Sequence, residues 1–414
     1  MSTIAAARPS VSSARMSQSS AAAVGVAVAV LGILLVTWIS QPHLAFNWVM
    51  GLGVGAVLQR GRFCFAGAFR DLFLMRNGTV LRAILVGLAL ATPAFALIEL
   101  RSVPNPSFGA LPQGAHVIPF GVHLVVGGVL FGVGMVVAGG CVSGTLYRIG
   151  EGYLASWASL GGILVGLELA AYTWNGWWNV EMQYAPMVWL PAALGYGGAV
   201  AATLLLLGAA YVAVVWWESR DAGPAFPAPP STKLPPTTFA ERIGAVRAAV
   251  FTRGWPPLAA AIALAWLNVA AFQADHPIGV TGEIAAWADR AAGAVGAAAP
   301  PLLGADLMAG CNLVLEKLGV VNEFTMLDGG LIVGALLAAL IAGEFKFRAP
   351  RQRRRYVQSL GGGVLMGYGA GIAVGCTLGA FFSAIPSLGL NGWAFGLSLL
   401  VGAGLGTQII KRIA

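Results

Sequence analysis

The chain has 414 residues, of which 58% are hydrophobic and 10% charged, whereas ordinary soluble domains carry about 25% charged residues. Its mean hydropathy of +0.79 leaves too few polar side chains to cover a soluble fold of this length. The composition therefore excludes an ordinary soluble enzyme and predicts an all-α polytopic membrane protein. The net charge of +8 would indicate a nucleic-acid partner only if membrane topology left the basic residues unexplained.

Apolar runs of about 20 residues mark the predicted membrane spans. We expect about nine or ten spanning helices, placed in chain order near 21–40, 44–59, 80–99, 120–138, 153–173, 187–216, 256–273, 328–343, 358–374 and 391–410. The first run follows a Ser-rich head and resembles a signal peptide. Its length and the lack of a clear small-x-small cleavage site favour a retained anchor.

The positions of the basic residues predict the orientation of the chain. With a cytoplasmic N-terminus and ten spans, only Arg101, Arg290 and Lys317 of the 24 basic residues fall outside the inner segments. This agrees with the positive-inside rule. Both termini are then expected in the cytoplasm, and topology explains the basic charge without any nucleic acid.

A Pro-rich stretch is typical of a solvated linker and divides the chain into two halves. The predicted organisation is a disordered cytoplasmic head at 1–20, an extra N-terminal span at 21–40, a first repeat at 44–175, a connecting span at 186–217, the cytoplasmic linker at 218–255 and a second repeat at 256–414.

The two halves share a glycine and cysteine pattern at a constant offset of 235 residues. Gly128-Val-Leu-Phe-Gly132-Val-Gly134, leading to Cys141, corresponds to Gly363-Val-Leu-Met-Gly367-Tyr-Gly369, leading to Cys376. Under the predicted orientation, Cys64 and Cys141 follow spans that run inward, whereas Cys311 and Cys376 follow spans that run outward. This pattern predicts an inverted repeat; a duplication kept for packing alone is the alternative.

Each of the four cysteines lies where an apolar run breaks at glycine and a segment of roughly 8 to 12 residues follows, too short to span a bilayer. These segments are predicted to be four short re-entrant half-helices. Irregular backbone at membrane depth is tolerated only where it is buried in protein or lines a cavity. The motif C-x-x-G occurs at Cys64, Cys141 and Cys376, whereas Cys311 is followed by Asn312-Leu313-Val314.

A cysteine at the start of a half-helix lies among unpaired backbone N–H groups, which attract an anion. A neutral thiol adds a weak S–H donor and a soft, polarizable contact, and this combination suits a sulfur-bearing anion. Buried apolar cysteines and structural disulfides remain alternatives. Because there is no C-x-x-C and no nearby histidine, we expect no metal site, and we expect no cofactor.

These motifs resemble those of the YeeE/YedE family of bacterial inner-membrane sulfur transporters. The resemblance rests on Gly61-Arg62-Phe63-Cys64-Phe-Ala-Gly67, Ala138-Gly139-Gly140-Cys141-Val-Ser-Gly144, Val374-Gly375-Cys376-Thr-Leu-Gly379 and Gly389-Leu-Asn391-Gly392. It covers most of 44–410. It implies thiosulfate uptake across the inner membrane, an hourglass-like path built from spanning helices and half-helices, and relay of the ion between cysteine thiols.

Carried over residue by residue, the resemblance makes Cys141 the central contact, with Cys64 and Cys376 on the path and Cys311 the weakest candidate. The expected path-lining glycines are Gly67, Gly140, Gly144, Gly375 and Gly379. The resemblance also suggests a cytosolic TusA-like sulfur-carrier protein as partner, besides membrane lipid. The chain is then a transporter and not an enzyme.

Three other functions stay open at this point. The first is a membrane sulfurtransferase that forms a cysteine persulfide. The second is a transporter of a selenium or other sulfur species, and the third is a scaffold for sulfur-carrier enzymes.

Other polar residues carry less information. Glu168 is the one acid well inside a predicted span, and His43, His116, His123 and His276 are expected to be ordinary surface residues. Without a chain of acids or histidines through the spans, the sequence argues against a proton-driven pump. Arg62, Arg148 and Glu151 border the inner cysteine segments. Anchoring at the cytoplasmic face accounts for the arginines; an influence on the exit of the anion is the alternative.

Overall fold

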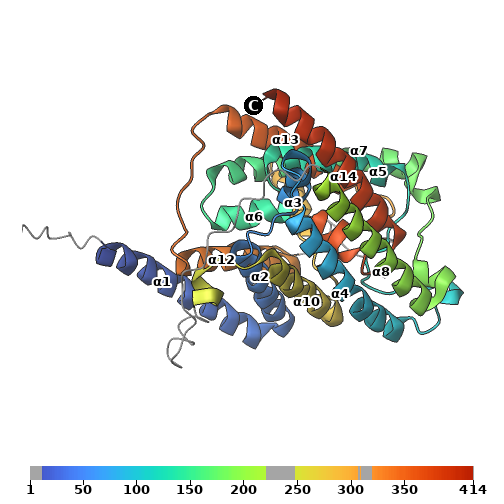
Figure 1. Cartoon of the computed structure of the whole chain (residues 1–414), viewed down its shortest axis with the longest axis horizontal. Helices are drawn as coiled ribbons and strands as arrows, with labels where there is room; N and C mark the ends of the chain where they lie inside the picture. The colour runs from blue at the N-terminus through green and yellow to red at the C-terminus, as the bar shows by residue number, and fades with distance from the viewer. Residues whose placement is uncertain (1–11, 221–247, 306–307, 309–318, 414) are drawn as a thin grey trace, which may run out of the picture.

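The computed structural model describes residues 12–220, 248–305, 308 and 319–413. The regular elements of these residues are helices, arranged as one bundle (Figure 1). In the first half they are α1 (Ser12–Ser40), α2 (Pro42–Arg60), α3 (Phe65–Leu74), α4 (Thr79–Ser102), η1 (Pro106–Phe108), α5 (Val122–Ala138), α6 (Val142–Gly150), α7 (Leu154–Val180), η2 (Met182–Tyr184) and α8 (Leu190–Ser219).

The second half repeats this alternation of long and short helices. Its elements are η3 (Ala248–Thr252), α10 (Pro257–Ala274), α11 (Thr281–Ala294), α12 (Glu323–Ile341), α13 (Arg354–Ile372), η5 (Thr377–Ser383) and α14 (Leu390–Ile413). The described residues thus form an all-α fold, as the composition predicted.

Within the described part of the chain, eight helices are long and apolar enough to cross a membrane. The number rises to nine if α13 and η5, which meet at an angle of 48°, are counted as one broken span. The tenth predicted span is α2, whose polar ends include His43, Asn47 and Gln59. Because α2 packs mainly against α12, part of its surface faces protein and does not have to be apolar. The chain is a multi-pass membrane protein.

Helix α1 lies at the edge of the bundle and projects from it (Figure 1). Its apolar stretch, Ala22–Ser40, is only 6% buried by the rest of the chain, and its contacts are with α2 and α12. An apolar helix with so little protein cover needs lipid around it, so the first run is a membrane helix and not part of a soluble core.

The most extensive helix pairs join the two halves of the chain. They are α7 with α13, α2 with α12, α5 with α14, α5 with α13, and α4 with α10. Each pair takes one helix from before the Pro-rich linker and one from after it. The two halves therefore pack into each other and form one core.

Glycines allow α5 and α13 to approach at backbone distance. A Cβ added to Gly134 would lie 2.5 Å from the backbone N of Met366, and a Cβ added to Gly369 would lie 2.7 Å from the backbone N of Phe131. Gly369 and Met366 follow Gly134 and Phe131 by the offset of the internal repeat, 235 residues. One contact is thus made twice with its partners exchanged, the pattern of two copies related by a two-fold axis.

A second pair of corresponding glycines lies just before these on each helix. Gly132 brings α5 close to α14, where a Cβ would lie 2.6 Å from the carbonyl O of Leu399. Gly367, its counterpart on α13, faces α7, where a Cβ would lie 2.9 Å from Cα of Ile163. Small residues of this kind permit the close helix contact that drives packing in membranes.

Candidate functional site

Each described cysteine is the residue immediately before a short helix. Cys64 precedes α3, Cys141 precedes α6 and Cys376 precedes the π-helix η5, and these helices have 10, 9 and 7 residues. They correspond to three of the four predicted half-helices. Cys311, the weakest of the predicted candidates, lies outside the described residues.

A recurrent backbone turn explains why a long helix stops and a short one starts at each cysteine. The residue two positions before the cysteine has a positive φ in all three motifs: 46° at Arg62, 83° at Gly139 and 51° at Val374. This conformation is uncommon for residues other than glycine, and for a β-branched valine it is an outlier. Such strain persists where the surrounding structure imposes it, often at functional sites.

The Cys64 and Cys141 thiols meet at the starts of α3 and α6. Both Sγ atoms lie 3.2 Å from the point where a Cβ on Gly144 would sit, so the two thiols line the same gap. Both residues are buried and carry free thiols. The Sγ of Cys141 also accepts a hydrogen bond from the backbone N–H of Gly144 at 3.3 Å and lies 3.4 Å from Oγ of Ser143.

The Cys376 segment packs against the segments that carry Cys64 and Cys141. Thr377, the first residue of η5, places its hydroxyl beside the Cys141 thiol. This hydroxyl is fully buried and makes no hydrogen bond of standard geometry. The ring of Phe65 at the start of α3 packs edge-on against Phe382 of η5, with ring centroids 5.7 Å apart. The structure therefore brings the three described cysteine segments together, and Cys376 is itself buried with a free thiol.

The predicted path-lining glycines have different surroundings. Gly144 faces the thiol pair, whereas a Cβ on Gly67 would meet only Cβ of Cys64, at 3.7 Å. A Cβ on Gly140 would lie 3.2 Å from Nη1 of Arg148. The remaining two, on the Cys376 segment, are both buried; Gly375 has a φ of 149° and Gly379 lies within η5. Of Gly67, Gly140, Gly144 and Gly375, Gly144 is the one at which an added Cβ would have two cysteine sulfur atoms as its nearest neighbours.

Arg148 of α6 lies beside the two glycines that precede Cys141. Its Nη1 donates a hydrogen bond to the carbonyl O of Gly139, and its side chain lines two adjacent cavities of about 450 and 470 Å³. It forms no salt bridge with any described carboxylate. This partly buried cation therefore lies next to the Cys141 motif and lines both cavities.

Sequence reasoning missed Ser143 and Thr377, the hydroxyls that contact the Cys141 thiol. Both lie inside the cysteine motifs: Ser143 is two residues after Cys141, and Thr377 directly follows Cys376. A hydroxyl in a half-helix motif is the signal that could have found them, because a side-chain donor at membrane depth needs a partner.

The expectation that all four histidines lie at the surface was wrong for two of them. His116 and His123 are buried. Nδ1 of His123 forms a hydrogen bond with Oε2 of Glu181 at 2.6 Å, and Cε1 of His116 lies 3.4 Å from the point where a Cβ on Gly375 would sit. Burial lowers the pKa of His116 to about 4.

The prediction of a single acid inside the spans was also wrong. Glu99 of α4 and Asp328 of α12 are fully buried, and their carboxylate oxygens make no hydrogen bond within the described chain. Both residues fell at the limits of predicted spans, where hydropathy alone treats an acid as a boundary. Glu168, by contrast, is only partly buried.

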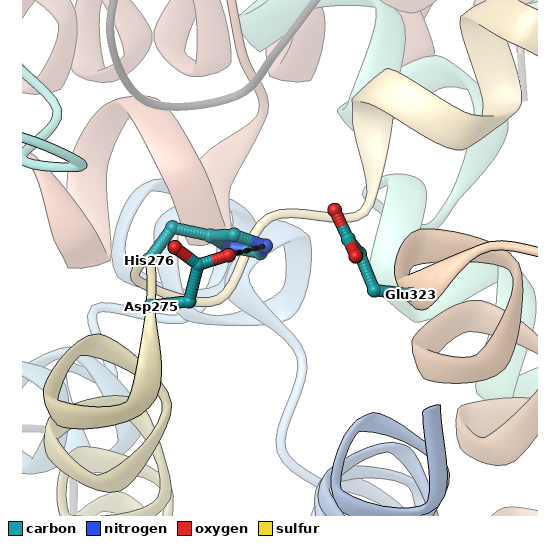
Figure 2. Close-up of side chains that lie close together, drawn as sticks. All are labelled: Asp275, His276 and Glu323. Atoms are coloured by element: carbon teal, nitrogen blue, oxygen red, sulfur yellow. Dashed lines mark ion pairs between the residues drawn. The ribbon is translucent and has the colours of Figure 1, made fainter. Parts of the chain in front are cut away.

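A separate cluster joins the end of α10 to the start of α12. Figure 2 shows Glu323 facing Asp275 and His276. One ring nitrogen of His276 and one carboxylate oxygen of each acid lie within 4.8 Å of one another. The His276 ring stacks on Phe324 with centroids 4.7 Å apart, and its Nδ1 donates to the carbonyl O of Pro277. These contacts give His276 a structural role that connects the α10–α11 loop to α12.

Comparisons with known proteins agree with the cysteine motifs. A family model described as sulphur transport matches residues 60–405. The chain is 28% identical over 346 residues to the thiosulfate transporter TsuA of Escherichia coli (strain K12), covering 83% of this chain and 88% of that protein. It is also 28% identical over 368 residues to the thiosulfate transporter TsuA of Spirochaeta thermophila, covering 86% and 95%. The probable transporter YedE of Escherichia coli (strain K12) is 32% identical over 191 residues, covering 46% and 45%.

Proposed function

Because the chain belongs to the sulphur transport family, we propose that it takes up thiosulfate or a related sulfur anion across the bacterial inner membrane. The observation that carries this proposal is the meeting of the Cys64 and Cys141 thiols at the starts of two short helices. Two relatives that align with most of the chain are named thiosulfate transporters, which supports thiosulfate as the cargo.

The proposed mechanism replaces the water around the anion with fixed donors. A dianion is very costly to place in hydrocarbon without compensating hydrogen bonds. The N-terminal N–H groups of α3 and α6 supply partial positive charge, and neutral thiols supply weak S–H donors and soft contacts. Cys141 is the central contact, because Cys64 and Thr377 both lie beside it. Cargo passes from thiol to thiol by transient hydrogen bonds, with no covalent intermediate.

The proposed architecture is an inverted repeat around an hourglass-like path. The first repeat is 44–175 and the second is 256–414, joined by a connecting span at 186–217 and the linker at 218–255. The exchanged contacts of Gly134 and Gly369 support the two-fold relation between them. With both termini in the cytoplasm, the repeats insert in opposite directions.

A second candidate is a membrane sulfurtransferase, favoured by the electrostatic influence of Arg148 on Cys64. In that reaction a Cys thiolate attacks the outer sulfur of thiosulfate, the S–S bond breaks, and sulfite leaves with the electron pair. The product is a cysteine persulfide. Transport of intact thiosulfate leaves no such adduct.

Purified protein in liposomes separates the two candidates. Thiosulfate labelled separately at each sulfur should enter with both labels in the original ratio, and Cys141→Ala should abolish uptake. Cys141→Ser restores an O–H donor without a sulfur nucleophile and should keep part of the uptake if hydrogen bonding carries the relay. Sulfite release with a persulfide on Cys141 would instead establish the enzyme, and no uptake by the unaltered protein would leave a scaffold.

The ranking of the cysteines has its own test in the same vesicles. Cys311→Ala should reduce uptake less than Cys141→Ala does, because its segment lacks the glycine of the C-x-x-G motif. Equal losses would overturn the ranking. Competition by selenium oxyanions in this assay distinguishes a selenium transporter, and binding of a purified TusA-like carrier to vesicles of known orientation tests the proposed cytosolic partner.

A further inference from the structure

We propose that the chain holds a second oxyanion site, in a cavity between α6, α7 and α13 that we call the arginine cavity. The cavity has a volume of about 450 Å³, and its lining includes Arg148, Arg348, Arg351, Arg355, Ser159 and Ser359. The inference rests on the proposed function, because the cavity would be the next binding site for an anion that leaves the thiol pair. Its ligand class is a small tetrahedral oxyanion such as thiosulfate or sulfate.

The arginine cavity is lined by arginines and, among the described residues, by no aspartate or glutamate. Arg148 and Arg348 also line the adjacent cavity, where Glu151 and Glu344 lie. Arg148 and Arg355 form no salt bridge with any carboxylate in the described ranges, and the side chain of Arg355 donates to Gln358. Arg348 donates to two backbone carbonyls, of Glu151 and Glu344. Arg148, Arg348 and Arg355 are partly buried, and a small anion in the cavity would supply a counter-charge for them.

In the adjacent cavity, carboxylates accompany the basic side chains. Arg62, Arg148, Lys346 and Arg348 line it together with Glu151 and Glu344. Oε2 of Glu344 forms a salt bridge with Nη1 of Arg60 at 3.3 Å, and its Oε1 forms one with Arg62 at 3.3 Å. An anion bound there would have to compete with Glu151 and Glu344. The arginine cavity has no such competitor.

The arginine cavity is adjacent to the cysteine motif through Gly139 and Gly140. Arg148 donates to the carbonyl O of Gly139, and Nη2 of Arg355 lies 2.7 Å from the point where a Cβ on Gly139 would sit. These glycines immediately precede Cys141. An anion that passes the Cys141 segment therefore meets two guanidinium groups next, and both glycines keep the space between them free of side chains.

The donor chemistry of the cavity fits oxygen atoms and not sulfur. Guanidinium groups bind oxyanions through paired N–H donors, and the buried hydroxyls of Ser159 and Ser359 add donors. None of the three described cysteines lines this cavity. We therefore expect it to accept sulfate as well as thiosulfate, whereas the thiol pair should prefer the ion that carries a soft sulfur atom.

Sulfate binding to full-length protein in detergent tests the site separately from transport. The protein carries Cys64→Ala and Cys141→Ala, which remove the thiol pair, and binding is measured by isothermal titration with sulfate. Losing a charge-assisted hydrogen bond should weaken binding by about tenfold or more in Arg355→Gln. The matched control is Arg353→Gln, which removes the same charge two residues away from a side chain outside the cavity lining and should bind like its parent.

The titrations distinguish a sulfate site in the arginine cavity from a lipid site and from the absence of any anion site. Equal sulfate affinity in the parent, Arg355→Gln and Arg351→Gln proteins, all with unchanged thermal unfolding, would overturn the proposal. An anionic lipid headgroup is the other source of the same chemistry, and binding is therefore repeated in nanodiscs of phosphatidylcholine with or without phosphatidylglycerol. Loss of sulfate binding in the phosphatidylglycerol discs would assign the site to lipid.

The uptake assay tests the thiol relay independently of the sulfate titration. If Cys141→Ala keeps full uptake, the proposed function of the thiol pair is wrong, whatever the sulfate titration shows. If uptake depends on Cys141 but sulfate does not bind to the protein without the Cys64 and Cys141 thiols, the relay stands and the arginine cavity is not an anion site. The supporting result is Cys141-dependent uptake together with Arg355-dependent sulfate binding.

Discussion

Adding one methyl group between the paired thiols should reduce transport strongly without unfolding the protein. In Gly144→Ala the new Cβ lies 3.2 Å from Sγ of Cys141 and 3.2 Å from Sγ of Cys64. Ordinary contacts of a Cβ lie at 3.4–4 Å, so each thiol has to move by a few tenths of an ångström. The methyl then fills the gap in which an anion would contact both sulfur atoms.

The expected cost in stability is small because two effects oppose each other. Overpacking a filled site costs about 1–3 kcal/mol, while alanine in place of a helical glycine contributes about 1 kcal/mol. The variant should therefore lose no more than about 2 kcal/mol. The uptake rate should fall by about 30-fold, because the methyl removes two thiol hydrogen bonds of about 1 kcal/mol each.

The assay measures initial uptake of labelled thiosulfate and thermal unfolding on one preparation of vesicles and detergent-solubilised protein. Gly67→Ala is the matched comparison, because it adds the same methyl at the same position of the Cys64 motif. There the nearest atom is Cβ of Cys64 at 3.7 Å, and uptake should fall much less. Wild-type uptake by Gly144→Ala would show that the gap between the thiols is not on the path. Equal losses in both variants would show that flexibility of the half-helix starts, and not the thiol gap, limits transport.

Three further predictions follow from the packing and the charges. Gly369→Ala places a Cβ 2.7 Å from the backbone N of Phe131 and should lower stability by about 3 kcal/mol, whereas Gly361→Ala on the same helix meets nothing within 4 Å and should be neutral or stabilising; equal melting temperatures would contradict the close crossing of α5 and α13. Burial lowers the pKa of His116 to about 4, so between about pH 6.5 and pH 4 the unfolded chain binds a proton that the folded chain does not, and stability should fall by about 3 kcal/mol as the pH falls through this window. Melting curves of His116→Gln should lack this component, and a parallel pH dependence in the variant would refute it. A reporter fused after Ala414 should behave as cytoplasmic; an external reporter would reverse the orientation.

The cysteine motifs show how far local sequence can predict a site. The glycine break, the positive-φ turn and the short helix after Cys141 all depend on a few neighbouring residues, so the half-helix was predictable. The meeting of Cys64 with Cys141 was not, because it depends on how α3 and α6 are placed by the helices around them. The same holds for Thr377, which reaches Cys141 from the second half of the chain.

By itself, the sequence determined that this is an all-α membrane protein with an internal repeat and cysteines at helix breaks. Hydropathy, glycine spacing and helix length are properties of about 20 consecutive residues and need no knowledge of the fold. Only the tertiary structure decided which thiols meet, that Glu99 and Asp328 are buried, and that the arginine cavity lacks a carboxylate. Those features arise where helices from opposite halves pack, and the burial and charge balance of a side chain depend on neighbours that are distant in the chain.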